Sequence, residues 1–194
     1  MTTADDPLVR FAETFARAGA NAPFDHTAAT LGTATVKGVP SVRTVLVRGV
    51  DAEGLTFYTN YESRKGRELT ENPVAALCFY WPWIDEQVLV EGSVVRLDPS
   101  ASDVYFRSRP RGSQLGAWAS RQSQPLSSRE ELEARYRTVE ERFAGTDVPR
   151  PPHWGGFRLI PYRIEFWKAG QHRLHDREVY TRGDHGWTRT RLFP

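Results

Sequence analysis

The feature that most constrains the fold is a series of short runs rich in β-branched and aromatic residues. In the first half these runs lie at residues 27–36, 40–50, 55–61, 74–81 and 86–97. Turn signals separate the early ones, namely Lys37-Gly38 and the sequence Asp-Ala-Glu-Gly at 51–54. Short strands joined by tight turns usually pair with their neighbours in antiparallel order. This half of the chain therefore predicts an antiparallel meander.

Helical patterns surround and interrupt these runs. The predicted helices lie at 6–20, 63–73, 100–109, 113–123 and 127–143. Ser63 is the expected N-cap of the second, and Asn72-Pro73 its stop. After a loop at 147–156, strand patterns return at 157–167, 173–180 and 186–193. Six to eight antiparallel strands with helices inserted late predict an α+β fold, a small antiparallel barrel with peripheral helices.

Composition narrows the class of protein. Of the 194 residues 39% are hydrophobic, enough for the core of one domain spanning 1–194, with residues 1–26 as N-terminal helix and lead-in. The net charge of +2 gives no argument for nucleic acid or an anionic membrane. Because neither a run of roughly 20 apolar residues nor a signal-peptide pattern is present, we expect a cytoplasmic protein. The single Cys78 lies in an apolar run, which favours a buried structural thiol.

One candidate anion site lies at Ser63-Arg64-Lys65-Gly66. Free backbone N–H groups and two cations converge where a helix begins, and this arrangement binds phosphate in many proteins. The alternative is an ordinary capped helix with two solvated charges. The pattern alone leaves both open.

A second candidate is the set Tyr105, Arg109 and Ser113, spaced every four residues. Pro110 disfavours helix at Arg109, so one helix should end there and Ser113 could cap the next. A hydroxyl, a guanidinium fork and a helix start would form a second phosphate clamp. With no metal-ligand spacing of Cys or His, the two sites favour a phosphorylated aromatic cofactor and a phosphorylated ligand.

Near the C-terminus Arg173, His175 and Arg177 alternate along a predicted strand. Alternate residues share one face of a strand, so these three groups should form a row, with Leu174 on the opposite face as a packing residue. Charged residues also protect exposed sheet edges. A solvated edge is therefore the alternative to a functional row.

Several longer motifs together resemble the pyridoxamine 5′-phosphate oxidase family. They are, in order, SVRTVLVRG, FYTNYESRKGREL, NPVAALCFYW, QVLVEG, YFRSRPRGSQLGAWASRQS, WGGFR, IEFW and RLHDR. The resemblance implies a homodimeric split β-barrel that binds FMN at the subunit interface. It also implies oxidation of pyridoxine or pyridoxamine 5′-phosphate to pyridoxal 5′-phosphate, with reduction of O₂ to H₂O₂ and release of ammonia from the amine.

The resemblance also implies roles for individual residues, and from the spacing of Cys and His no metal site is expected. Those expected to bind FMN are Arg43, Thr44, Val45, Leu46, Tyr58, Thr59, Arg64, Lys65, Gln87, Gln122, Ser123, Trp167 and Arg177. Those expected to bind substrate are Arg48, Tyr105, Arg109, Ser113, Arg173 and His175. Arg173 and His175 are also the expected catalytic residues, which would hold the reacting carbon against the flavin.

The chain departs from the family pattern in three ways. Arg48 stands where the family usually has Lys, which changes reach and geometry. An ideal strand also places Arg43 and Arg48 on opposite faces, so both can serve one site only through a bend or the dimer partner. Glu86 stands where Arg is expected, beside the flavin site. The segment before the barrel is short, and the family's N-terminal substrate-covering region has no clear counterpart.

Two other functions remain open on the sequence. One is an FMN oxidase of the same fold with another substrate, such as those of phenazine biosynthesis, although the Tyr105, Arg109, Ser113 set favours a phosphorylated substrate. The other is a protein that stores or delivers flavin or pyridoxal phosphate without catalysis. A nucleic-acid role for the Arg-rich 107–121 stretch is less favoured because the net charge is small.

Overall fold

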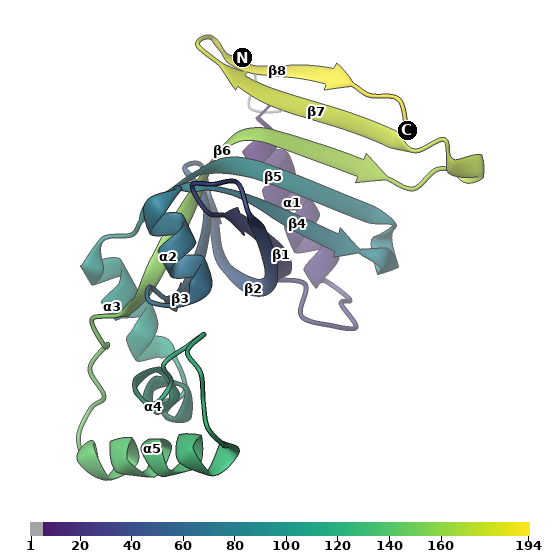
Figure 1. Cartoon of the computed structure of the whole chain (residues 1–194). Coiled ribbons are helices and arrows are strands. Elements are labelled where there is room, and N and C mark those ends of the chain that lie inside the picture. Colours follow the sequence, from purple (N-terminus) through teal and green to yellow (C-terminus); the bar gives the residue numbers. More distant parts are fainter. Residues whose placement is uncertain (1–5) are drawn as a thin grey trace.

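Eight antiparallel strands form one sheet in the computed structural model, which describes residues 6–194. The sheet order is β3-β2-β1-β4-β5-β6-β7-β8, and β3 also pairs with β6. That extra pairing closes the first six strands into a barrel, from which β7 and β8 extend as a hairpin (Figure 1). The strands are β1 (Ala28–Ala34), β2 (Pro40–Asp51), β3 (Gly54–Asn60), β4 (Val74–Trp81), β5 (Glu86–Arg96), β6 (Trp154–Lys168), β7 (Asp176–Gly183) and β8 (Gly186–Arg191). The predicted α+β antiparallel split barrel is confirmed.

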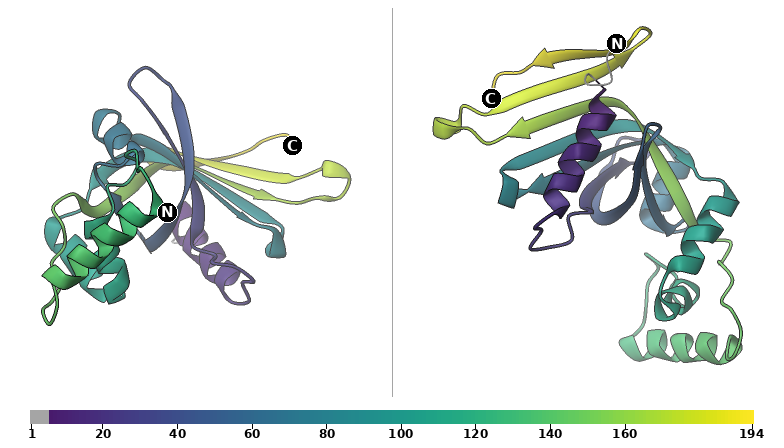
Figure 2. Two further views of the ribbon diagram at one scale, coloured as in Figure 1. Left: turned by 60° about the horizontal axis from the view of Figure 1, so that its bottom comes forward. Right: turned by 180° about the vertical axis from the view of Figure 1, so that it is seen from behind.

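The helices lie outside the barrel (Figure 1). They are α1 (Pro7–Gly19), α2 (Arg64–Glu71), α3 (Pro99–Ser108), α4 (Arg111–Ala119) and α5 (Arg129–Arg142), with short 3₁₀ turns η2 (Pro82–Ile84) and η3 (Gln171–Arg173). Helices α3, α4 and α5 gather at one end of the molecule, whereas α1 lies across the sheet near β4 and β5 (Figure 2). No helix within residues 6–194 is long and apolar enough to cross a membrane.

The core follows the alternation of the strands. In β4 the buried residues are Ala75, Leu77, Phe79 and Trp81, every second position, as a strand with one inward face requires. Phe11 of α1 packs its ring 5.1 Å from that of Phe79, which fixes the helix to the sheet. A second core lies beneath α3 to α5 and contains Phe106, Leu115, Phe143, Val148 and Trp154.

Helix ends follow the local signals at α2. Ser63 caps the helix by accepting a hydrogen bond from the backbone N–H of Gly66, and Asn72 before Pro73 ends it.

Cys78 on β4 is a half-buried free thiol, not the fully buried one that the sequence predicts, and burial raises its pKa.

The predicted strand at 173–180 is wrong in its first part. β7 begins only at Asp176, and the chain before it forms the turn η3, in which His172 and Arg173 have positive φ values of 55° and 63°. Gly170 permits this turn, because a Cβ there would lie 1.9 Å from the carbonyl oxygen of Leu174. The turn interrupts the strand alternation before it can reach Arg173.

The predicted row of alternating groups therefore does not exist. Arg173 lies in η3, His175 just before β7, and only Arg177 lies within the strand. Leu174 is 72% exposed instead of packed on an opposite face. Because a turn has no period of two, spacing in the sequence does not place these side chains on one face.

Candidate active site

A cavity of about 450 Å³ lies where β2 and β3 meet the starts of α2 and α4. Seven residues predicted to bind FMN line it, namely Thr44, Val45, Leu46, Tyr58, Thr59, Lys65 and Gln122. Four residues predicted to bind substrate line the same cavity, namely Arg48, Tyr105, Arg109 and Ser113. The fold thus brings side chains from distant parts of the sequence into one space.

Lys65 provides a partly buried cation at this cavity. Its Nζ donates hydrogen bonds to Gln122 Oε1 at 3.0 Å and to Thr59 Oγ1 at 3.1 Å. Burial, and next the charge of Arg43, lower the pKa of Lys65 to about 8. Because Lys65 lies in the first turn of α2, its charge adds to the positive end of the helix dipole, and an anion is favoured here.

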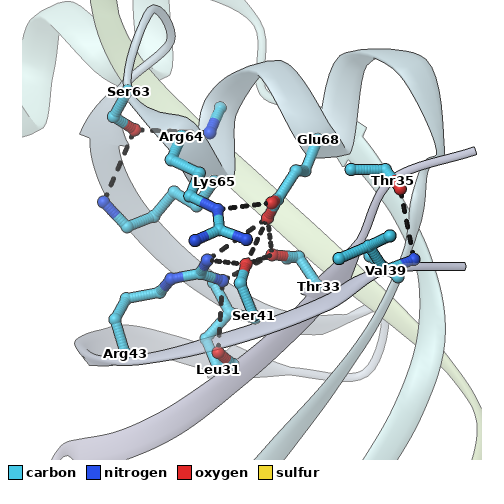
Figure 3. Close-up of polar contacts among 12 residues, drawn as sticks. Leu31, Thr33, Thr35, Val39, Ser41, Arg43, Ser63, Arg64, Lys65 and Glu68 are labelled. Atoms are coloured by element: carbon cyan, nitrogen blue, oxygen red, sulfur yellow. Dashed lines mark hydrogen bonds and ion pairs between the residues drawn. The ribbon is translucent and has the colours of Figure 1, made fainter. Parts of the chain in front are cut away.

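Arg43 and Arg64 point instead to the buried carboxylate of Glu68, as Figure 3 shows. Arg64 Nε donates to Glu68 Oε1 at 2.9 Å and Arg43 Nη2 to Oε2 at 3.2 Å. Thr33 and Ser41 also donate their hydroxyls to Oε2. Burial alone would raise the pKa of Glu68, but the hydrogen bonds lower it to about 2. Neither arginine lines the cavity, although both were predicted to bind FMN.

Aromatic rings form one wall of the cavity. The rings of Tyr58 and Tyr105 stack at 3.8 Å, and that of Trp154 lies 5.6 Å from Tyr58 and nearly parallel. The Arg109 guanidinium carbon lies 4.6 Å from the Trp154 ring centre. Its Nη1 is buried without a hydrogen-bond partner, and burial lowers the pKa of Arg109. A buried donor without a partner costs free energy, so Arg109 Nη1 is well placed to donate a hydrogen bond to an anionic ligand.

Pro110 separates α3 from α4 as predicted, but the cap differs. Arg109 is extended, with φ −73° and ψ 148°, as a residue before proline should be. The N-cap of α4 is Pro110 itself, and no side chain caps the helix, so the predicted cap role of Ser113 is wrong. Ser113 lies within the first turn, where its N–H bonds to the Pro110 carbonyl. The break in the helix still places Arg109 and Ser113 on one cavity wall.

Arg48 and Arg43 diverge, as the alternation in β2 predicts. The register of β2 against β3 shifts between Val47 and Gly49, so Arg48 lies at an irregularity. Arg48 lines the cavity and its guanidinium contacts Thr27 and Asp25, whereas Arg43 turns toward Glu68.

The remaining predicted groups lie elsewhere on the chain. Gln87 pairs with Trp167 across β5 and β6, and Trp167 pairs with Arg177 across β6 and β7. The His175 ring lies 4.7 Å from that of Trp167, and Arg177 Nε donates to the buried Glu165 at 2.7 Å. We call Gln87, Trp167, Arg173, His175 and Arg177 the hairpin cluster. It lies at the end of the sheet opposite to α3 and α4 in Figure 1, so one chain does not unite it with the cavity.

Two further predicted positions have distinct surroundings. Ser123, with a positive φ of 68°, lines a neighbouring space of about 550 Å³ that shares Gln122 with the first cavity. Glu86, which departs from the family pattern, pairs with Arg17 at 2.6 Å and with Lys168 at 3.8 Å. Glu86, which has the opposite charge to the expected Arg, thus joins α1 to the end of the sheet through these ion pairs.

Sequence reasoning missed Glu68 and Trp154. Glu68 stands four residues after Arg64, a spacing that predicts an ion pair on a helix, but the bond to Arg43 depends on the fold. Trp154 opens the WGG motif, yet nothing local indicates its contact with Arg109.

Family models match two consecutive parts of the chain. Residues 19–143 match the family model described as pyridoxamine 5′-phosphate oxidase. Residues 154–194 match the model described as the pyridoxine 5′-phosphate oxidase C-terminal dimerisation region. This second match contains Trp167, Arg173, His175 and Arg177 of the hairpin cluster.

Similar proteins cover nearly the whole chain. The pyridoxine/pyridoxamine 5′-phosphate oxidase of Anaeromyxobacter dehalogenans is 58% identical over 96% of this chain and 94% of its own. That of Myxococcus xanthus is 57% identical over 97% of this chain and 92% of its own.

Among solved structures, PhzG from Burkholderia lata, in complex with tetrahydrophenazine-1-carboxylic acid, superposes with a TM-score of 0.93 at 34% identity, covering 100% of this chain and 95% of its own. An FMN-binding protein from Nostoc punctiforme shares the fold, with a TM-score of 0.74 at 20% identity and 96% coverage of each chain. The family models and the near-complete coverage by relatives agree, and the chain belongs to the pyridoxamine 5′-phosphate oxidase family.

Proposed function

We propose that this protein is an FMN-dependent oxidase of phosphorylated B6 vitamers. Pyridoxine 5′-phosphate and O₂ would give pyridoxal 5′-phosphate and H₂O₂, and the amine would in addition consume water and release ammonia. The observation that carries the proposal is the buried Arg109 Nη1 without a partner, in a cavity that Lys65 enters from α2. One cavity thus offers cationic groups from two different elements, which suits a ligand and a cofactor that each carry a phosphate.

The cavity residues fit the phosphate and chain of a flavin mononucleotide. Lys65 and the start of α2 would hold the phosphate, and Thr59 and Gln122 already bond to the Lys65 ammonium. The β2 segment at 44–46 would lie along the flavin, with its apolar side chains Val45 and Leu46 excluding water. When bound, FMN supplies hydride acceptance from the substrate and transfer of electrons to O₂.

Substrate would lie against the aromatic wall. Arg109, Tyr105 and Ser113 would bind its phosphate, with Arg48 as a further cation. The Arg109 guanidinium is held over Trp154, so its direction is set before the ligand arrives. Anchoring at the phosphate would leave the pyridine ring to be positioned by the rest of the site.

The hairpin cluster would reach this site from the partner subunit of a homodimer. The matched dimerisation region contains most of it, and within one chain it lies away from the cavity. Arg173 and His175 of the partner subunit would hold the reacting carbon. Arg177 of the partner subunit would stand beside the flavin as a fixed cation, its direction set by Glu165, and would favour charge that develops there during hydride transfer.

A phenazine-type oxidase is the second candidate, because PhzG has the same fold. Its identity of 34% is well below the 58% and 57% of the B6 oxidases, and Arg109, Tyr105 and Ser113 favour a phosphate. A storage or delivery protein would bind the same ligands without turnover.

One experiment separates these functions. The purified protein is incubated with FMN, its visible spectrum is recorded, and peroxide is assayed with pyridoxine 5′-phosphate and with a panel of reduced aromatic compounds. We expect a yellow dimer that forms peroxide with the phosphorylated vitamer. Peroxide only with unphosphorylated aromatics would favour the phenazine-type function, and a yellow protein without peroxide would favour a binding protein.

A further inference from the structure

The Glu68 carboxylate is the meeting point of three elements next to the proposed flavin phosphate site. Glu68 is only 4% exposed and lies on α2. Thr33 of β1 and Ser41 of β2 donate to its Oε2 at 2.5 and 2.6 Å. Arg43 and Arg64 approach the same carboxylate, as Figure 3 shows. All four donors stabilise its charged form, which a buried carboxylate requires.

The two arginines use different parts of their guanidinium groups. Arg64 bonds to Glu68 through Nε alone, and it makes no other hydrogen bond or ion pair with residues 6–194. Its side chain is 56% exposed, so the two terminal nitrogens are open to an anion. Arg43, by contrast, uses both terminal nitrogens, on Glu68, Ser41, Thr33 and the Leu31 carbonyl. Arg43 therefore contributes mainly charge, while Arg64 has donors to offer.

Holding Arg64 at Nε fixes the plane of its guanidinium. A guanidinium gripped on one edge presents its other edge in a defined direction, and less side-chain entropy is then lost when it binds an anion. The neighbouring Lys65 lines the cavity, and its ammonium points away from Glu68 and toward Ser63 (Figure 3). Arg43, Arg64 and Lys65 with Glu68 carry a net charge of +2, which matches a phosphate dianion.

We propose that Glu68 is a positioning residue for the flavin phosphate: it orients Arg64, and through Arg43 the adjacent strand, without touching the ligand. This inference rests on the proposed function, because it assumes that the phosphate binds at the start of α2. The opposing possibility is that Glu68 only competes with the phosphate for the two arginines. In that case removal of its charge would strengthen phosphate binding.

The test compares FMN with riboflavin, which lacks the phosphate. Dissociation constants of both are measured by flavin fluorescence quenching on the full-length protein freed of flavin, for the wild type, Glu68→Ala and Glu68→Gln. The ratio of the riboflavin dissociation constant to the FMN dissociation constant measures the preference for FMN, and it isolates the contribution of the phosphate. A general loss of structure would weaken both flavins alike and leave the ratio unchanged.

We expect Glu68→Ala to reduce the preference for FMN at least tenfold, with riboflavin affinity within about twofold of the wild type. Glu68→Gln should keep most of the preference, because its amide oxygen can still accept from Arg64 Nε. Glu178→Ala is the matched control, since Glu178 also gathers several arginines but lies on β7. It should leave the ratio unchanged.

Three results would overturn the inference. An unchanged ratio in a folded Glu68→Ala protein would leave Glu68 a purely structural residue, and an increased ratio in both Glu68 variants would make it a competitor. If Glu68→Ala does not fold, Ser41→Ala replaces it, because this change removes the Ser41 hydroxyl that contacts both Glu68 and Arg43. Ser41→Ala should lower the ratio by a smaller factor, and an unchanged ratio would count equally against the inference. A wild type without preference for FMN would refute the phosphate site itself, which is a different failure.

Discussion

At the scale of single residues, the protonation of Lys65 should make FMN affinity depend on pH. Its pKa of about 8 in the free protein lies below the ordinary 10.5, and a bound phosphate would raise it by favouring the ammonium form. Binding therefore takes up a proton above about pH 8. We predict that FMN affinity is constant near pH 7, where Lys65 is charged, and falls as pH rises through 8, by up to about tenfold per pH unit.

The measurement is an FMN titration from pH 6.5 to 9.5. Lys65→Arg should remove the decline, because a guanidinium stays protonated throughout this range. Lys65→Ala should weaken binding at neutral pH by about 1.5–3 kcal/mol and show no such pH dependence. A decline that persists in both variants would assign the titration to another group.

Substitutions of Arg48 test whether this part of the cavity binds the substrate phosphate. Its contacts with Thr27 and Asp25 are long, at 3.3 and 3.8 Å, so the side chain is weakly committed within the protein. We predict that Arg48→Ala raises KM for pyridoxine 5′-phosphate about tenfold, corresponding to roughly 1.4 kcal/mol, while FMN affinity is unchanged. Arg48→Lys should stay within about threefold of the wild type. Steady-state kinetics with a parallel FMN titration decides this, and equal small effects of both variants would remove Arg48 from the site.

At the scale of elements, local signals predicted α2, the break at Pro110 and most strands, because each depends on neighbours in the sequence. Ser63 caps α2 through an atom three residues away, and Pro110 acts on the residue before it. The turn η3 was not predictable in this way. Its shape depends on Gly170 lying against the backbone of Leu174, a contact that composition does not reveal, and the run of strand-like residues concealed it. The bond between Arg43 and Glu68 likewise joins a strand to a helix that are distant in sequence.

This turn leads to a prediction about the β6–β7 connection. A Cβ at Gly170 would lie 1.9 Å from the Leu174 carbonyl oxygen, so Gly170→Ala must displace the turn that carries Arg173 and leads to His175. We expect kcat/KM to fall at least tenfold, with flavin affinity nearly unchanged and only a small shift of the melting temperature, because the turn is exposed. Gly183→Ala is the control, since a Cβ there has no neighbour closer than 3.9 Å. Normal kinetics in Gly170→Ala would show that the turn tolerates displacement.

At the scale of the whole molecule, the eight-stranded sheet carries the cavity near one end and the hairpin cluster near the other (Figure 1). The sequence motifs identified both groups, but not that they lie apart, because distance within one chain depends on how β6 to β8 extend from the barrel. In a two-fold dimer each site would take its cavity from one subunit and its hairpin cluster from the partner. The dimerisation region in the C-terminal part supports this arrangement.

Mixed dimers test the arrangement directly. At an FMN concentration that saturates wild-type sites but not Lys65→Ala sites, Lys65→Ala leaves the cavity half largely without flavin and His175→Ala impairs the hairpin half, so each homodimer should have little activity. In a dimer of one Lys65→Ala and one His175→Ala chain, one site would contain both substitutions and the other neither. Random reassembly of equal amounts makes half of the dimers mixed, so we predict about a quarter of wild-type activity in the unseparated mixture and about half in the purified mixed dimer. The variants are refolded together or co-expressed with different tags, the mixed dimer is purified, and peroxide formation is measured. If both halves of a site came from the same chain, every site would contain one substitution, and the mixed dimer would be as inactive as its parents.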